Sequence, residues 1–181
     1  MDDIEGALEL LKKALAQNPN DITIQIDIAN LYATNKKFLE ATIYFRQLLS
    51  LTNGNEDIKQ GLTFCLAEIG NNYQLNRKYK LAKDTFEEAL AHDPNNSDYL
   101  FNYGNALFSL NQFDSAIDAY QGSINNNLIK PDADTYNNLG NAYRRLGKNK
   151  DAIKFYKKAL EINPELIHSK VELTHLMQHI C

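Results

Sequence analysis

The sequence is poor in the features that mark secreted, membrane-bound and nucleic-acid-binding proteins. Its two cysteines, Cys65 and Cys181, are too few and too far apart to suggest a disulfide framework. No apolar run approaches the roughly 20 residues that span a bilayer. The net charge is −4, and lysine and arginine form no basic block. Asp2, Asp3 and Glu5 stand where a signal peptide would carry positive charge. We therefore expect a cytoplasmic protein in a reducing compartment, with neither a membrane nor a nucleic acid as its partner.

Motifs for catalysis and for cofactor binding are also missing. The sequence has no phosphate-binding loop and no Ser-His-Asp or Cys-His pattern in a recognisable context. His175 and His179 share a helix face close to Cys181, but no HExxH motif and no clear fourth ligand accompany them. We expect no enzyme activity, no cofactor and no metal site within these residues. Whether the full-length protein is an enzyme stays open.

What the chain does contain is a recurring frame of small residues. Alanines recur at intervals of 34, 41, 34 and 36 residues, namely Ala7, Ala41, Ala82, Ala116 and Ala152. Ahead of the last four stands a second phrase, a small residue followed by asparagine: Ala29-Asn30, Gly70-Asn71, Gly104-Asn105 and Gly140-Asn141. A period near 34 indicates stacked units, each too small to bury a core alone. The pattern predicts a scaffold that holds a partner.

Each unit is expected to consist of two helices. Four prolines follow amphipathic segments and mark helix ends, at Pro19, Pro94, Pro131 and Pro164. Between them, apolar residues recur at helical spacing. Glycine inside a helix costs about 1 kcal/mol relative to alanine. Gly104 and Gly140 make sense there if two helices cross so closely that a larger side chain would clash. We expect the recurring alanines to supply the matching small surface on the second helix.

This pattern resembles the tetratricopeptide repeat. The last unit carries nearly all of the shared positions: Leu139, Gly140, Tyr143, Ala152, Tyr156, Ala159 and Pro164. The resemblance covers essentially the whole chain and implies an all-α, right-handed α-solenoid of helix-turn-helix repeats. It also implies that the first helices line a concave inner surface. One departure is that Gln25, Leu66, Leu100 and Tyr136 stand where the family often has tryptophan.

The frame divides the chain into a single array. It comprises a half repeat with only a second helix (1–20), repeats at 22–55, 56–96, 97–132 and 133–166, and a terminal first helix (167–181). The 41-residue interval places seven extra residues, about two helical turns, after the turn Asn53-Gly54-Asn55. This predicts a long helix from about Glu56 to Leu75, with a disordered insertion as the alternative.

The two ends of the array also carry expectations. The first helix is expected at Ile4 to Gln17 and the last at about Glu165 to Cys181. The last helix holds four residues in core-like positions, namely Leu173, Leu176, Met177 and Ile180. Because the chain begins and ends within a repeat, we expect a piece of a longer protein with apolar faces uncovered at its ends.

Candidate binding residues follow from the expected inner surface. One polar row comprises Asn30, Asn71, Asn105 and Asn141, and a second row, three residues earlier, comprises Asp27, Glu68, Asn102 and Asn138. An asparagine side chain offers two donor hydrogens and an acceptor oxygen. It can therefore pair with both the N–H and the C=O of an extended peptide, whatever that peptide's side chains. The alternative is that these asparagines bond to the neighbouring repeat or face water.

The same helix faces supply four further candidates. Phe101 and Phe108 belong to the expected groove, and Arg144 and Arg145 could grip a carboxylate or phosphate, or else be solvated near a helix end. Some members of the resembling family hold an acidic C-terminal tail in a clamp of Lys, Arg and Asn. That clamp needs a cation four residues before each groove asparagine, where this chain has Ile26, Ala67, Phe101 and Asn137. The resemblance therefore does not favour an acidic-tail clamp.

Three hypotheses of function remain. The first is a non-catalytic protein–protein interaction scaffold that binds an extended polypeptide in the concave groove. The second comes from the tail His175-Leu-Met-Gln-His179-Ile-Cys181, which resembles the segment that joins repeats to the catalytic region in O-linked N-acetylglucosaminyltransferase-like proteins. It implies a substrate-recruiting arm whose catalytic region lies beyond Cys181. The third is self-assembly into a homo-oligomer through the end helices.

Overall fold

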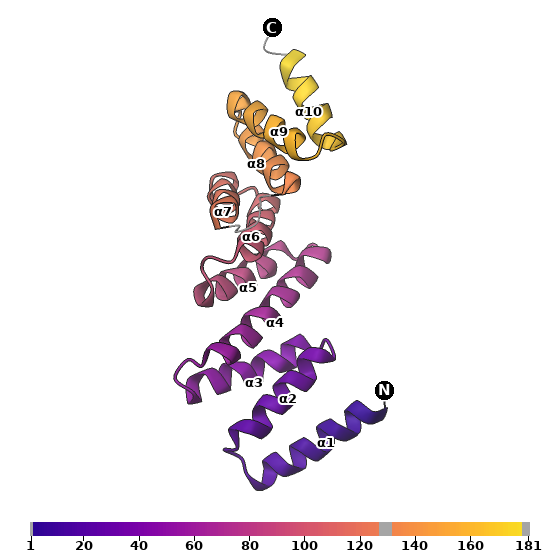
Figure 1. Cartoon of the computed structure of the whole chain (residues 1–181), viewed down its shortest axis with the longest axis vertical. Coiled ribbons are helices and arrows are strands. Elements are labelled where there is room, and N and C mark those ends of the chain that lie inside the picture. Colours follow the sequence, from indigo (N-terminus) through magenta and orange to yellow (C-terminus); the bar gives the residue numbers. More distant parts are fainter. Residues whose placement is uncertain (1, 127–131, 179–181) are drawn as a thin grey trace. The chain divides into compact units, whose positions relative to one another are not determined.

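The computed structural model describes residues 2–126 and 132–178, and within them the chain forms ten α-helices joined by short turns (Figure 1). The helices are α1 (Asp2–Gln17), α2 (Ile22–Thr34), α3 (Phe38–Leu51), α4 (Glu56–Leu75), α5 (Tyr79–His92), α6 (Ser97–Ser109), α7 (Phe113–Asn126), α8 (Ala133–Arg145), α9 (Asn149–Ile162) and α10 (Ile167–Gln178). The expected all-α class is confirmed. The residues fall into two compact units, Met1–Asn72 and Tyr73–Cys181, so the border lies inside α4.

The helices begin and end where local chemistry dictates. Asp21, Asn96 and Asp132 cap α2, α6 and α8, and each side-chain oxygen accepts a hydrogen bond from the backbone N–H three residues later. Three of the four prolines lie in the connections that follow α1, α5 and α9, as expected, and Pro131 lies outside the described residues. The turns inside the hairpins use a left-handed residue: Lys36, Arg77, Asn111 and Gly147 have φ values of 58°, 57°, 60° and 72°.

The first unit packs successive helices against one another. Helix α2 packs on both α1 and α3. Phe38 of α3 meets Phe64 of α4 edge-on, with ring centroids 6.0 Å apart. Gly61 of α4 lies so close to Phe45 that an added Cβ would be 2.7 Å from its ring. The core residues of this unit include Ile28, Ala29, Ala41, Phe45, Leu48, Leu62 and Leu66.

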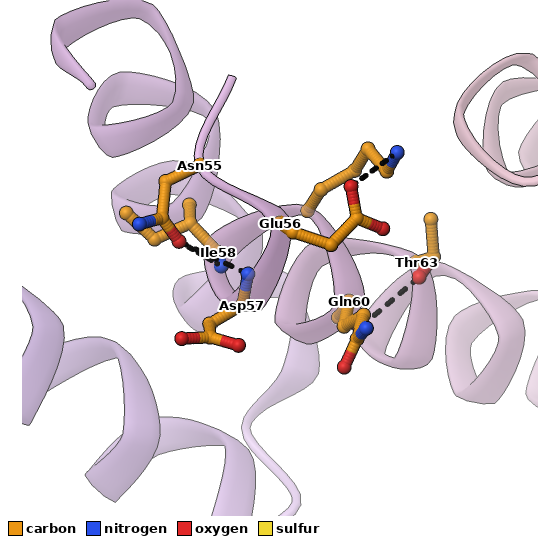
Figure 2. Close-up of polar contacts among 7 residues, drawn as sticks. Asn55, Glu56, Asp57, Ile58, Gln60 and Thr63 are labelled. Carbon is orange, nitrogen blue, oxygen red and sulfur yellow. Dashed lines mark hydrogen bonds and ion pairs between the residues drawn. The ribbon is translucent and has the colours of Figure 1, made fainter. Parts of the chain in front are cut away.

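Helix α4 is the longest of the described helices, and a local turn and cap define where it begins. Asn53 and Gly54 adopt φ values of 50° and 84° and turn the chain. Figure 2 shows Asn55 at the start of the helix, where its Oδ1 accepts hydrogen bonds from the N–H of Asp57 (3.0 Å) and of Ile58 (3.2 Å). The helix then runs for 20 residues, Glu56–Leu75. The predicted long helix is therefore confirmed, and the extra residues are not a disordered insertion. The limits of the individual repeats stay a prediction.

In the second unit, each helix from α5 to α10 packs against the next one along the chain (Figure 1). The second helices bury the expected pattern of alanine, aromatic and small residue: Ala82, Phe86 and Ala89; Ala116, Tyr120 and Ser123; Ala152, Tyr156 and Ala159. These residues form the buried face of each second helix. Because the pattern repeats, α6 and α8 pack on their second helices through equivalent faces and leave equivalent faces uncovered by them.

Gly104 and Gly140 lie in close contact with the rings of tyrosines on the second helix of their repeats. A Cβ added at Gly104 would lie 2.7 Å from the ring of Tyr120, and one added at Gly140 would lie 2.7 Å from the ring of Tyr156. The expected clash of a larger side chain is thus confirmed for these two positions. The nearest atoms belong to the tyrosine four residues after the recurring alanine on the second helix, and the role of the alanines as the facing small surface stays a prediction.

The end helices differ in detail from the expectation. Helix α1 starts two residues before Ile4, and α10 starts two residues after Glu165. Leu176 is buried with Ala152 and Tyr156, and Leu173 packs against them. Met177 is not a core residue, since 52% of it is exposed, and Ile180 lies outside the described residues. None of the helices within residues 2–126 and 132–178 is long and apolar enough to cross a membrane.

Candidate functional site

The second unit contains a pocket of about 320 Å³ on the face shared by α6 and α8. Its lining consists of Asn105, Phe108 and Ser109 of α6, Tyr120 of α7, and Asn138 and Asn141 of α8. Residues three or four apart on a helix share one face, which explains why each helix contributes its residues as a group. The six side chains are uncharged at neutral pH. The volume is at the lower end of the range of ligand-binding pockets.

The amide of Asn105 is held in one orientation by two neighbours. The hydroxyl of Tyr120 donates a hydrogen bond to Asn105 Oδ1 at 2.8 Å. Asn138 Nδ2 donates to the same oxygen at 3.0 Å. An amide oxygen has two lone pairs, so both are occupied. The orientation of the Asn105 amide is therefore fixed, with its oxygen turned toward the protein.

A line of hydrogen bonds connects this amide to the last helix. Asn137 Nδ2 donates to Asn138 Oδ1 at 3.3 Å. The hydroxyl of Ser169 in α10 donates to Asn137 Oδ1 at 2.8 Å. Asn137 and Ser169 are both buried. Each side chain of this series donates a hydrogen bond to the next one. The order is Ser169 on α10, Asn137, Asn138 and finally Asn105 on α6.

Asn141 repeats part of this geometry in the following repeat. The hydroxyl of Tyr156 donates to Asn141 Oδ1 at 2.8 Å, and each tyrosine stands 15 residues after its asparagine. Burial raises the pKa of Tyr120, and burial followed by the charge of Glu172 raises the pKa of Tyr156 to about 12. Both phenols therefore keep their proton and act as donors at neutral pH.

The remaining candidates of the second unit lie outside the pocket lining. Phe101 packs against the ring of Tyr120 with centroids 6.1 Å apart, and the backbone oxygen of Asn102 accepts a hydrogen bond from Gln74. Arg144 Nε pairs with Glu172 Oε2 at 3.2 Å. Arg145 lies 4.9 Å from the centroid of the Phe113 ring. Each arginine has a protein partner of its own, and a joint grip on an anion stays a prediction.

Four candidates belong to the first unit. Asp27 and Asn30 lie exposed on α2, whereas Glu68 and Asn71 lie half-buried on α4. The structure therefore brings Asn105, Phe108, Asn138 and Asn141 together in one pocket. A polar row that continues through all four repeats stays a prediction.

Sequence reasoning missed the residues that orient the asparagines, namely Tyr120, Tyr156 and Ser169, and it also missed Ser109 at the rim. One signal was present in the sequence. The residue 15 positions after each row asparagine is Phe45, Phe86, Tyr120 or Tyr156, so only the last two repeats carry a hydroxyl there. In the part of the chain that the structure describes, no three His, Cys, Asp or Glu side chains gather as metal ligands, and His179 and Cys181 lie outside that part.

Comparison with known families decides which class of repeat this is. Two family models, both described as tetratricopeptide repeat, match residues 68–126 and 133–166, which together make up just over half of the chain. The chain belongs to the tetratricopeptide-repeat family. The sequence-based assignment is thus confirmed.

Two curated relatives match most of this tetratricopeptide-repeat chain. The human protein O-mannosyl-transferase TMTC1 is 25% identical over 166 residues, which are 89% of this chain and 18% of TMTC1. The type IV pilus assembly protein PilF of Pseudomonas aeruginosa is 23% identical over 157 residues, 87% of this chain and 59% of PilF. The chain therefore spans less than two thirds of the length of either relative.

Solved structures of other tetratricopeptide-repeat proteins share the fold. The first such domain of Spaghetti (RPAP3), bound to the HSP90 peptide SRMEEVD, is 28% identical, covers 65% of this chain and 92% of its own, and superposes with a TM-score of 0.61. YrrB, described as having an unusual peptide-binding site, is 22% identical with a TM-score of 0.60, covering 93% of this chain and 82% of its own. MamA is 24% identical with a TM-score of 0.60, covering 91% of each chain.

Proposed function

We propose that this chain is a non-catalytic protein-interaction module whose second unit binds an extended polypeptide across α6 and α8. The observation that carries the proposal is the pocket in which Asn105, Asn138 and Asn141 gather beside Phe108. The solved complex of the 28%-identical RPAP3 domain with a peptide supports a polypeptide as the ligand.

The chemistry of the pocket favours main-chain recognition. Amide side chains bond to peptide groups, which every polypeptide carries whatever its sequence. The lining supplies no charge to select an acidic or a basic segment. Two positions where an acidic-tail clamp would need a cation hold Phe101, which packs on Tyr120, and Asn137, which is bonded to Ser169. We therefore propose a ligand selected by its backbone and its apolar surface.

An array of 15-residue peptides of randomised sequence tests the proposal. We expect a subset of these peptides to bind the full chain. Simultaneous substitution of Asn105, Asn138 and Asn141 by alanine should weaken their binding about tenfold or more, because each hydrogen bond contributes roughly 0.5–1.5 kcal/mol and 1.4 kcal/mol is tenfold in affinity. The matched control is Asn95→Ala with Asn125→Ala, two exposed asparagines outside the pocket.

Two results would overturn the proposal. One is an array to which the full chain does not bind at all. The other is a triple variant that binds the array peptides as tightly as the control while its helical circular dichroism signal is unchanged.

A second candidate function is the substrate-recruiting arm of a longer glycosyltransferase. The relationship to TMTC1 favours it, since the match covers 89% of this chain and only 18% of that transferase. On this hypothesis the native polypeptide carries a catalytic region besides these repeats. The triple asparagine variant of that polypeptide should lose transfer to long polypeptide acceptors and retain transfer to short ones. Equal loss with both acceptors, or a native protein without a catalytic region, would contradict the hypothesis.

A further inference from the structure

The hydrogen bonds inside the pocket decide which kind of group Asn105 can offer to a ligand. Asn105 Oδ1 already accepts from Tyr120 and from Asn138, so this side chain has no acceptor left for a ligand. Within residues 2–126 and 132–178, neither hydrogen on Asn105 Nδ2 is donated to a protein acceptor. Both are therefore available to a ligand in the pocket. Asn105 can donate to a ligand oxygen and cannot accept from a ligand N–H.

Its neighbours strengthen this donor character. In the series Ser169–Asn137–Asn138–Asn105, each side chain donates a hydrogen bond to the next. Hydrogen bonds in such a chain polarise one another. An amide that accepts two hydrogen bonds at its oxygen becomes a better donor at its nitrogen. Asn141 Oδ1 is likewise engaged, by Tyr156. Exposed Ser109 donates its hydroxyl hydrogen to the backbone oxygen of Asn105 at 2.9 Å and so offers an acceptor at the rim of the pocket.

We propose that Asn105 reads a carbonyl oxygen of the bound polypeptide and that the ligand residue at this position needs no N–H. The pocket then accepts proline-containing segments, because proline has a carbonyl acceptor and lacks a backbone donor. Proline-rich chains also adopt an extended helix without internal hydrogen bonds, which leaves their carbonyls free. Phe108, which is only partly buried, provides aromatic surface in the lining, a feature of sites that take such segments. This inference rests on the proposed function and specifies its ligand.

The roles of the two key residues can be separated by nearly isosteric changes. Asn105→Asp keeps oxygens to accept from Tyr120 and Asn138 and removes the donor nitrogen. Tyr120→Phe keeps the ring, as the phenylalanines at the matching positions 45 and 86 do, and removes one of the two hydrogen bonds that orient the amide. Tyr120 is thus a positioning residue, and Asn105 is the residue that contacts the ligand.

The probe is decaproline, whose internal residues carry only acceptors. We expect its titration into the full chain to shift the side-chain amide NMR signals of Asn105 and to leave those of the exposed Asn95 unchanged. Asn105→Asp should weaken decaproline binding about tenfold, whereas Asn95→Asp, which adds the same charge elsewhere, should not. Tyr120→Phe should reduce the affinity ratio between decaproline and a ten-residue Gly-Ser peptide, because the lone pair of Asn105 Oδ1 that Tyr120 no longer occupies can accept from an N–H of the ligand. A purely structural role for Tyr120 would leave that ratio unchanged.

The outcomes separate this inference from the proposed function. If array peptides bind in the pocket while decaproline leaves the Asn105 signals unchanged, the carbonyl preference is wrong and polypeptide binding stands. If Asn105→Asp binds decaproline as tightly as the unmodified chain, the role of Asn105 is wrong. If neither the array nor decaproline binds, both proposals fail.

Discussion

At the scale of single residues, Gly140 shows how one missing side chain sets the geometry of the site. Its place on α8 lets the ring of Tyr156 come so close that an added Cβ would lie 2.7 Å away. We expect Gly140→Ala to lower the free energy of unfolding by about 1–2 kcal/mol. Overpacking costs typically 1–3 kcal/mol, and the better helix propensity of alanine returns up to about 1 kcal/mol. Urea unfolding followed by circular dichroism measures the difference.

The control for this change is Gly6→Ala on α1, where no atom lies within 4 Å of an added Cβ. That variant should be as stable as the original chain or more stable by up to about 1 kcal/mol, from helix propensity alone. If the two variants shifted stability equally, the close approach of Tyr156 would not be the cause.

Gln25 carries the opposite kind of defect, a polar group in a packed site. It is only 1% exposed, and its Nε2 donates to the backbone oxygen of Pro19 at 2.9 Å. Its Oε1 is buried with no hydrogen-bond partner among the described residues. An unsatisfied buried polar atom costs about 1–3 kcal/mol, whereas a net hydrogen bond returns about 1 kcal/mol. We expect Gln25→Met, which keeps the unbranched shape, to raise the free energy of unfolding by about 1 kcal/mol.

The measurement is the shift in urea midpoint relative to the original chain, with Gln25→Ala as the comparison. The alanine variant should be the least stable of the three, because it leaves a cavity. A methionine variant that is less stable than the glutamine original would show that the bond to Pro19 outweighs the buried oxygen.

The residue scale is also where the sequence is least informative about the site. Helical spacing places Asn105, Phe108, Asn138 and Asn141 on one face, and this part of the candidate site could be predicted. The bond from Tyr120 to Asn105 could not, because it depends on the rotamers of two side chains 15 residues apart. Periodicity determines which face a residue occupies, but not which atom of an amide meets its neighbour.

At the scale of elements, the start of α4 illustrates a helix fixed by a single side chain. Asn55 Oδ1 satisfies two of the backbone N–H groups that a helix start leaves unpaired (Figure 2). We expect Asn55→Ala to lower the free energy of unfolding of the first unit by about 0.5–2 kcal/mol, the usual cost of losing a cap. Amide hydrogen exchange should accelerate most at Asp57 and Ile58, which lose their acceptor.

Asn55→Asp is the matched control, because it keeps an acceptor oxygen at the same position and adds a charge that is favourable at a helix start. Its exchange rates at Asp57 and Ile58 should stay close to those of the original chain. If the alanine variant exchanged no faster than the aspartate variant at these two amides, the cap would not control the start of α4.

Element boundaries were more predictable than side-chain contacts because their signals are local. The turn Asn53-Gly54-Asn55 and the seven-residue excess together predicted the bounds of α4. The start of α10 was two residues off, since Glu165 lies in the turn where its backbone N–H bonds to the side chain of Asn163. The tight contacts at Gly104 and Gly140 were predicted, but the tyrosine rings that make them were not. The recurring alanines indicate that two helices pack closely, but they do not indicate which rotamer a neighbouring side chain adopts.

At the scale of the whole molecule, the two units share one property, a buried acidic group that stays protonated in the fold. Burial, followed by the charge of Glu68, raises the pKa of the Cys65 thiol in the first unit from 9.0 to about 11. In the second unit, burial is the main cause that raises the pKa of Tyr156 from 10.0 to about 12. In each case the folded state keeps a proton at a pH where the unfolded state has released it. Stability is therefore fully present below pH 9 and falls as the pH rises.

We expect the free energy of unfolding to decline between about pH 9 and 11 through Cys65 and between about pH 10 and 12 through Tyr156. At pH 10 the Cys65 thiol alone lowers the free energy of unfolding by about 1 kcal/mol, because one pKa unit corresponds to about 1.4 kcal/mol. Urea midpoints measured from pH 7 to 11 test this. Cys65→Ala should flatten the first part of the decline and Tyr156→Phe the second, even if either variant is less stable at pH 7. Because phenylalanine occupies the matching positions 45 and 86, the ring of the second variant has a natural precedent in this chain. A decline equally steep in the double variant would assign the alkaline sensitivity to other groups, among them the buried Tyr120, whose pKa is also raised by burial.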